Sequence, residues 1–234
     1  MKKVILLGFL LGSFFNIMAQ RNDSTYNGGN TQIMKDQLFA EAMKAYENKD
    51  YDLFWKISPD ISDIPEIQAK MAYCYLKGYG VEVNYSEFKK WELKAAEGGN
   101  WAAQLIVALY YETGKYGFPH DEAESLKWYL RAGENGKPTG YLNAGLKYIE
   151  GKGVPVTWEN KVKGFELLKK AYNLAYSKGL KKTIILSAYY LARCYEKGTG
   201  TSRSISKAVE YYREAAKEGD EYSQRALKRL GYSW

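Results

Sequence analysis

The chain has 234 residues, of which 46% are hydrophobic and 22 are tyrosines, which is enough apolar surface to form the core of one domain. The formal net charge of +7 is mild, and the lysines are spread along the chain rather than gathered with aromatic residues, so a nucleic-acid-binding protein is excluded. The mean hydropathy of −0.48 indicates that the chain after its N-terminal segment is soluble.

The first 19 residues have the pattern of a secretory signal peptide. Lys2 and Lys3 precede an apolar run over residues 4–15, and Ala19 supplies the small residue expected at a cleavage site. We expect cleavage after Ala19, export to the periplasm or the exterior of a bacterial cell, and no membrane span afterwards. An uncleaved anchor is the alternative, but the run is short for a span, contains two glycines and is followed by Asn16.

Two segments lie between the predicted signal peptide and a repeated region. Residues 20–31 are rich in Asn, Gly, Ser and Thr and predict a flexible linker. Residues 32–62 predict a pair of helices, one from Gln32 to Asn48 and one from Asp50 to Ile57. This pair lacks the glycines of the later units, so we expect an N-terminal capping unit.

Residues 63–220 contain four copies of one pattern. Each copy has two closely spaced glycines, a tyrosine three residues before the first glycine, and a small residue six before it. A fixed pattern repeated at this period is typical of a solenoid of stacked helical units. The glycine pairs are Gly78/Gly80, Gly114/Gly117, Gly151/Gly153 and Gly198/Gly200, and the tyrosines are Tyr75, Tyr111, Tyr148 and Tyr195.

The second half of each copy predicts another helix that ends at a glycine. In the second copy the glycines are one residue farther apart, so we expect a reshaped turn. The third copy is longer, and we expect three extra residues in its turn, four in its second helix and four in the next helix, which together project as a ridge. Residues 221–234 predict a C-terminal capping helix over 221–230. The closing glycines are Gly99, Gly136, Gly179 and Gly219.

This pattern resembles the Sel1-like repeat, a relative of the tetratricopeptide repeat. The resemblance implies an all-α fold, a right-handed α–α superhelix whose first helices line a concave face that binds other proteins. The fourth copy carries the match at Tyr195, Gly198, Gly200, Ala208, Tyr211, Tyr212, Ala215, Ala216 and Gly219.

Seven residues are candidates for contact with a partner on that face. Four of them lie four residues before the leading glycine of each copy, and the presence of a lysine in this column predicts that it borders solvent. Three neighbouring tyrosines complete the set. Because Cys74 and Cys194 lie in the first and fourth copies, we expect them to be too far apart for a disulfide. The candidates are Tyr73, Cys74, Tyr110, Lys147, Tyr189, Tyr190 and Cys194.

The sequence offers little chemistry for catalysis. The one histidine, His120, lies in a turn, and no metal-ligand spacing or nucleotide-binding context is present, so we expect no cofactor, no metal and no catalytic residue. Ser204 and Lys207 form an S-x-x-K match to β-lactam-interacting serine enzymes, but the companion motifs are missing and Ser204 is placed to cap a helix.

We therefore predict an exported, non-enzymatic scaffold, monomeric, that binds a protein or peptide. The alternatives are a cell-wall or glycan-binding module, since tyrosine and tryptophan also stack on sugars, and a β-lactam-interacting hydrolase.

Overall fold

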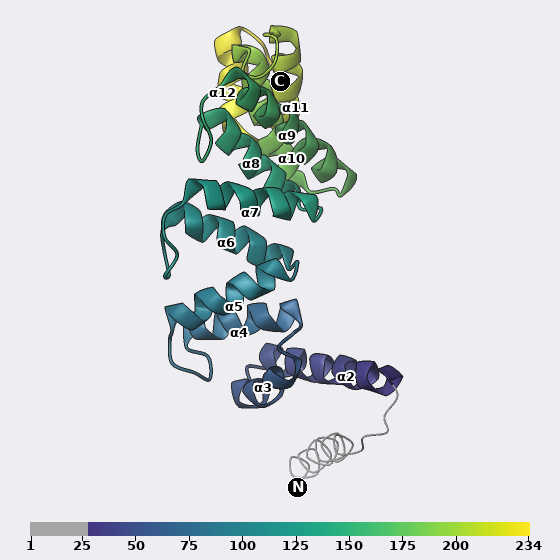
Figure 1. The fold of residues 1–234 in the computed structure, drawn as a ribbon. Helices are drawn as coiled ribbons and strands as arrows, with labels where there is room; N and C mark the ends of the chain where they lie inside the picture. The colour runs from purple at the N-terminus through teal and green to yellow at the C-terminus, as the bar shows by residue number, and fades with distance from the viewer. Residues whose placement is uncertain (1–27) are drawn as a thin grey trace.

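The glycine-bounded apolar stripes fold into a row of antiparallel helix pairs, and the predicted all-α solenoid is confirmed (Figure 1). The computed structural model describes residues 28–234, and within this range there are helices and turns but no strand. The predicted signal peptide (1–19) and most of the predicted linker (20–31) lie outside the described residues.

The helix pairs follow each other in chain order, with the N-terminal helices at one end and the C-terminus at the other (Figure 1). The N-terminal unit consists of α2 (Gly28–Glu47), α3 (Tyr51–Ile57) and a short 3-10 helix, η1 (Ser58–Ile61). The four pairs are α4 (Pro65–Lys77) with α5 (Tyr85–Glu97), α6 (Trp101–Thr113) with α7 (Glu122–Glu134), α8 (Pro138–Glu150) with α9 (Trp158–Ser177), and α10 (Lys181–Lys197) with α11 (Ile205–Lys217), and α12 (Glu221–Leu230) closes the row.

Most helix ends lie where the sequence places them. Helix α12 has the predicted bounds, and Asp50 caps α3 by accepting a hydrogen bond from the backbone of Leu53. Helix α2 is longer than predicted, because it begins at Gly28 instead of Gln32. The last four residues of the predicted linker are therefore helical, since each residue added to an existing helix gains a backbone hydrogen bond.

The glycine pairs have two separate roles. The first glycine of each pair ends its helix in the left-handed conformation, as at Gly198 with a φ of 70°. The second glycine allows the turn to touch the preceding pair: a Cβ on Gly200 would lie 2.1 Å from the Lys161 carbonyl oxygen, and one on Gly153 would lie 2.5 Å from that of Glu122. These turns therefore fix how one repeat stacks on the next.

The second repeat has the reshaped turn that its glycine spacing predicts. Tyr116 adopts a positive φ of 53°, and Gly117 follows with a φ of 82°. The turn directs Phe118 into the core, where it is 3% exposed and packs edge-on against Tyr111. The ring of Phe118 fills space that the altered turn would otherwise leave open.

The extra residues lie in α9 and in α10, the helix that follows it, and not in the turn of the third repeat, which corrects the prediction of a longer turn. Helix α9 has 20 residues, against 13 in the other second helices, α5, α7 and α11. Helix α10 has 17 residues, against 13 in the other first helices, α4, α6 and α8. Seven extra residues make nearly two helical turns, so α9 keeps its apolar stripe facing the core. Where α9 ends, Lys178 donates a 2.8 Å hydrogen bond to the Gly136 carbonyl of the second repeat. Where α10 begins, Lys181 pairs with Glu218 at the end of α11, so the lengthened helices contact the repeats on both sides.

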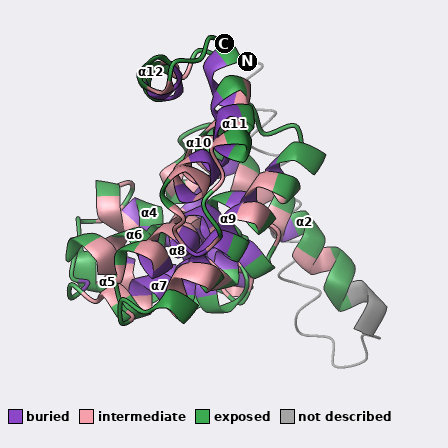
Figure 2. Cartoon of the chain, turned by 90° about the horizontal axis from the view of Figure 1, so that it is seen from above, coloured by how far each residue is buried: buried purple, intermediate pink, exposed green. Residues whose placement is uncertain are grey.

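The core runs along the row between the helices, and the buried residues lie on the faces where helices meet (Figure 2). The recurring tyrosines pack there: Tyr148 is 6% exposed, while Tyr75, Tyr111 and Tyr195 are half-buried against other rings. Among the helices of residues 28–234, none is long and apolar enough to cross a bilayer.

Candidate functional site

A groove of about 550 Å³ opens between the first helices of the N-terminal half of the row. Helices α2, α4 and α6 form its sides, and α5 supplies part of its floor. It is lined by five aromatic rings, namely Tyr46, Tyr73, Phe88, Trp101 and Tyr110. A concave site with apolar walls is the usual form of a binding pocket.

The rim of the groove is aromatic and open to solvent. Tyr73 is 39% exposed and Trp101 is 46% exposed, and Ile106, on α6, is 37% exposed. Three of the groove rings already carry lysines of the chain itself. The ammonium nitrogen of Lys137 is 3.5 Å from the Trp101 ring centroid, that of Lys70 is 4.5 Å from the Tyr46 centroid, and that of Lys77 is 5.7 Å from the Tyr73 centroid. The faces of the groove rings thus attract cations.

Glu92 is the buried carboxyl group of the groove. The residue is 2% exposed, and its Oε1 atom has no hydrogen-bond partner. Because burial removes water from the charged form, the pKa of Glu92 is raised to about 8. A carboxyl group held without a partner inside a groove is costly for the fold, and such groups cluster at functional sites.

The structure brings together two of the seven predicted partner-contacting residues. Tyr73 and Tyr110 both line the groove, and Tyr110 packs edge-on against Phe88 with ring centroids 5.6 Å apart. The expectation that the cysteine column borders solvent is wrong for the other members of that column: Cys74 is 0% exposed, Lys147 is 3% and Cys194 is 4%. In this position of the first helix, a side chain points into the contact with the neighbouring repeats.

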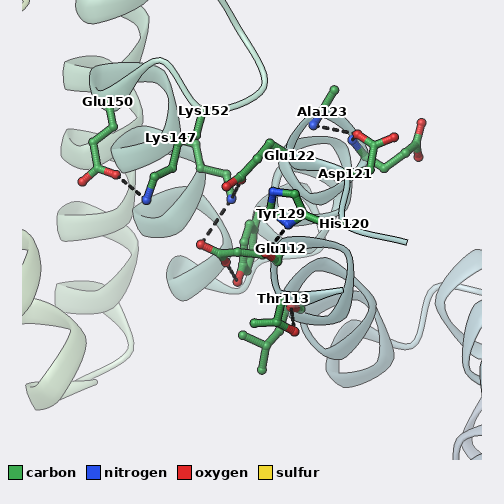
Figure 3. A network of polar contacts seen from close by, with 12 residues as sticks. Glu112, Thr113, His120, Asp121, Glu122, Ala123, Tyr129, Lys147, Glu150 and Lys152 are labelled. Carbon is green, nitrogen blue, oxygen red and sulfur yellow. Dashed lines mark hydrogen bonds and ion pairs between the residues drawn. The ribbon is translucent and has the colours of Figure 1, made fainter. Parts of the chain in front are cut away.

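Lys147 is buried because it is paired, which the sequence did not reveal. Its ammonium group, on α8, lies 3.3 Å from Glu112 Oε1 on α6 and also pairs with Glu122 at the start of α7 (Figure 3). The Tyr129 hydroxyl donates a 3.0 Å hydrogen bond to Glu112. Two carboxylates thus compensate the buried charge, so this cluster joins the second and third repeats and does not present a lysine to a partner.

The remaining predicted residues lie far along the row from the groove. Tyr189 and Tyr190, on α10, are half-buried, and their rings meet at 66° with centroids 5.1 Å apart. Tyr222, which is 65% exposed, lies 5.9 Å from the Tyr189 ring at 48°. Inclined rings offer a sugar no common flat face, so this cluster gives little support to the glycan-binding alternative.

Comparison with known proteins settles the family. The model of the Sel1 repeat matches residues 65–100, 101–137, 138–180 and 185–220, well over half of the chain. The chain belongs to the Sel1 repeat family. Each matched range covers all or most of one of the four helix pairs in the structure.

Solved Sel1 structures share this fold. A Sel1 repeat protein from Oxalobacter formigenes is 28% identical with a TM-score of 0.66, and the match covers 78% of this chain and 71% of that one. The protective antigen c5321 of uropathogenic Escherichia coli, which displays an SLR fold, is 26% identical with a TM-score of 0.62. That match covers 72% of this chain but 34% of c5321, so this chain spans about a third of its length. No curated protein matches.

Alignment of the four Sel1 repeats shows why Glu92 is unusual. The comparison concerns one position of the second helix and one position of the first helix in each repeat. In the second and fourth repeats a tyrosine hydroxyl there donates to a glutamate, and in the third both residues are apolar. The first repeat alone combines a carboxyl with an apolar residue. The four combinations are Glu92 with Leu76, Tyr129 with Glu112, Leu168 with Ile149, and Tyr212 with Glu196.

Sequence reasoning missed Glu92, although this alignment contains the signal. The residue lies eight positions after Asn84, the residue that caps α5, just as Tyr129 and Tyr212 lie eight after the caps of their helices. A carboxyl group in a column of large core residues is a local inconsistency, and such inconsistencies are expected at functional sites.

The motif that suggested a hydrolase is part of a helix start. Ser204 caps α11 by accepting a hydrogen bond from the Lys207 backbone, as predicted, and the Lys207 ammonium lies 5.2 Å from the Tyr195 ring centroid. His120 is exposed, and its Nδ1 donates to the Glu112 carbonyl at 2.7 Å (Figure 3). Residues 28–234 contain no cluster of three or more His, Cys, Asp or Glu side chains that could hold a metal ion.

Proposed function

We propose that this Sel1 repeat protein is an exported, non-enzymatic scaffold that binds a peptide segment of another protein in the groove between α2, α4 and α6. The observation that carries the proposal is the groove itself, with its aromatic walls and its open rim of Tyr73 and Trp101. Sel1 repeats form scaffolds commonly used for protein interaction and are generally non-catalytic. Rigid aromatic side chains supply contact area at a small cost in entropy.

A photo-crosslinking experiment with a matched control tests the binding surface. Benzoylphenylalanine is introduced at Tyr73, in the groove, and separately at Tyr176, an exposed tyrosine on α9. We expect one partner to be captured from the envelope fraction at position 73 and not at position 176. The captured partner is then purified, and its affinity is expected to fall at least tenfold for Trp101→Ala and to stay unchanged for Tyr176→Ala. Equal effects of the two substitutions would contradict the proposal.

Export is the second part of the proposal, and it rests on residues 1–19 of the sequence. We expect the mature protein to be a monomer that begins at Gln20, in the periplasm or outside the cell. N-terminal sequencing and intact mass of the protein from each cell fraction measure this directly. A chain that retains Met1 in the membrane fraction would contradict it.

A further inference from the structure

Three observations converge on the floor of the groove. Glu92 is buried there with Oε1 unpartnered, it stands where two other repeats have a tyrosine, and the position of their glutamate is occupied by Leu76, whose side chain cannot form a hydrogen bond. The protein therefore keeps, inside a space that is open to a ligand, an acceptor that nothing in its own structure satisfies. An acceptor of this kind is complementary to a donor brought by the ligand.

The charge of the groove indicates which donor this is. The charged residues that line it are Glu66 and Lys70, of opposite sign, and Glu92. Lys70 does not pair with Glu92, because its ammonium lies over the Tyr46 ring. At the rim, Lys77 and Lys137 lie over the rings of Tyr73 and Trp101. On the floor, no described cation pairs with Glu92, so an ionised Glu92 would be uncompensated there, beside the rings of Phe88 and Tyr110, whose faces also favour a cation.

We infer that the groove selects a lysine of the bound peptide, whose ammonium group pairs with the Glu92 carboxylate while its methylene stem packs between the aromatic walls. This inference rests on the proposed function, since it names the chemistry of the segment that the groove binds. Lysine fits better than arginine, because a compact ammonium on a slender stem can reach one buried carboxyl group, whereas a guanidinium has five donors to satisfy.

Binding is then coupled to the release of a proton. Burial keeps Glu92 protonated at neutral pH, because its pKa is about 8. When the ammonium arrives, the carboxylic acid gives its proton to solvent and becomes the carboxylate that pairs with the cation. The affinity for the peptide should therefore rise with pH, by up to about tenfold per pH unit, until the pKa of Glu92 is reached.

The other titratable groups that line the groove come from three helices. Glu66, Lys70 and Tyr73 come from α4, Tyr46 from α2 and Tyr110 from α6. Burial raises the pKa of Tyr46 and of Tyr110, so these two hydroxyls stay neutral across the range. A matched variant at Glu66, an exposed carboxyl group of the same groove, separates its contribution from that of Glu92.

The experiment starts from a randomised peptide library selected on the full mature chain. We expect the selected peptides to share a lysine. Binding of the best peptide is measured by calorimetry from pH 6 to 8, against the same peptide with that lysine acetylated. Acetylation of the peptide and the Glu92→Gln substitution should each weaken binding by at least about 30-fold, and Glu92→Gln should abolish the pH dependence. Glu66→Gln should leave the affinity and its pH dependence nearly unchanged.

The outcomes separate this inference from the proposed function. Peptides that bind in the groove, lose affinity with Trp101→Ala, and are indifferent to acetylation and to Glu92→Gln would overturn the lysine inference and leave the groove as the binding site. A library that yields no peptide sensitive to Trp101→Ala would overturn both. Glu92→Leu reproduces the apolar combination of the third repeat, so it should fold well, and it should lose the lysine preference as Glu92→Gln does.

Discussion

The Tyr212 hydroxyl donates a 2.8 Å hydrogen bond to Glu196 Oε2, from α11 back to the helix that precedes it. Burial alone would raise the pKa of Glu196, but the hydrogen bonds from Tyr212 and Arg229 lower it below its ordinary value. The same pair recurs as Tyr129 with Glu112 in the second repeat. This bond therefore belongs to the way the two helices of a repeat are joined.

Replacing Tyr212 with phenylalanine tests the strength of that bond. We expect Tyr212→Phe to lower the free energy of unfolding by about 1–2 kcal/mol, because Glu196 keeps its charge and loses a buried donor. A lowered folded-state pKa contributes stability above the pKa of the unfolded chain, so the loss should shrink as the pH falls below about 4. Thermal unfolding at pH 7 and pH 3 measures it. Tyr211→Phe is the control on the same helix, and an equal loss there would contradict the assignment.

Gly200 is predicted to be indispensable for the stacking of the fourth repeat on the third. A Cβ there would lie 2.1 Å from the Lys161 carbonyl oxygen, so Gly200→Ala must move backbone and should cost more than about 3 kcal/mol. Gly219 also has a positive φ, 91°, but a Cβ added to it would meet nothing within 4 Å, so Gly219→Ala should cost about 1–2 kcal/mol of backbone strain alone. Chemical denaturation measures the free energy of unfolding of the two variants side by side. Equal losses in Gly200→Ala and Gly219→Ala would contradict the stacking role of Gly200.

The buried ion pair of Lys147 should behave as a unit. Glu122→Gln leaves the ammonium with Glu112 alone and should destabilise the fold by about 1–3 kcal/mol, whereas Lys147→Met in the same background should restore part of that loss. Glu150→Gln, which breaks the exposed pair with Lys152, should cost less than about 1 kcal/mol. Denaturant unfolding of the single and double variants measures the coupling. A double variant less stable than Glu122→Gln would contradict it.

Glu92 should make the folded protein less stable as the pH rises. Its folded-state pKa of about 8 lies above the ordinary value of 4.5, so the folded chain holds a proton that the unfolded chain releases between these values. Stability should fall across this range by up to about 1.4 kcal/mol per pH unit. Glu92→Gln should therefore raise the melting temperature at pH 8 and have little effect at pH 4. Glu66→Gln serves as the exposed control, and a pH-independent effect of Glu92→Gln would count against the burial of its proton.

The two cysteines should be inert in the folded protein. Burial raises the pKa of both thiols to about 12, and each is less than 5% exposed. We expect almost no reaction of Cys74 and Cys194 with a thiol reagent at pH 8, and reaction of both after denaturation without prior reduction. Quantitative thiol labelling measures this. A denatured monomer that needs reduction before it reacts would contain a disulfide, contrary to the prediction.

The sequence by itself determined the repeat architecture, because glycine turns and apolar stripes act locally. A glycine that must adopt a positive φ, such as Gly198, and a stripe with helical spacing, such as that of α12, leave little choice of structure. The same local logic predicted that Ser204 caps α11. Recurrence at fixed spacing then identified the family from this chain alone.

Only the tertiary structure decided which side chains meet across repeats. Lys147 was expected to border solvent, yet it is buried, because the charges that compensate it come from α6 and α7. Tyr73 and Tyr110 lie in the groove, as predicted for partner contact, but its buried carboxyl group belongs to Glu92, on the second helix of the first repeat. Burial and pairing depend on neighbours far away in the chain, and a pattern within one helix does not record them.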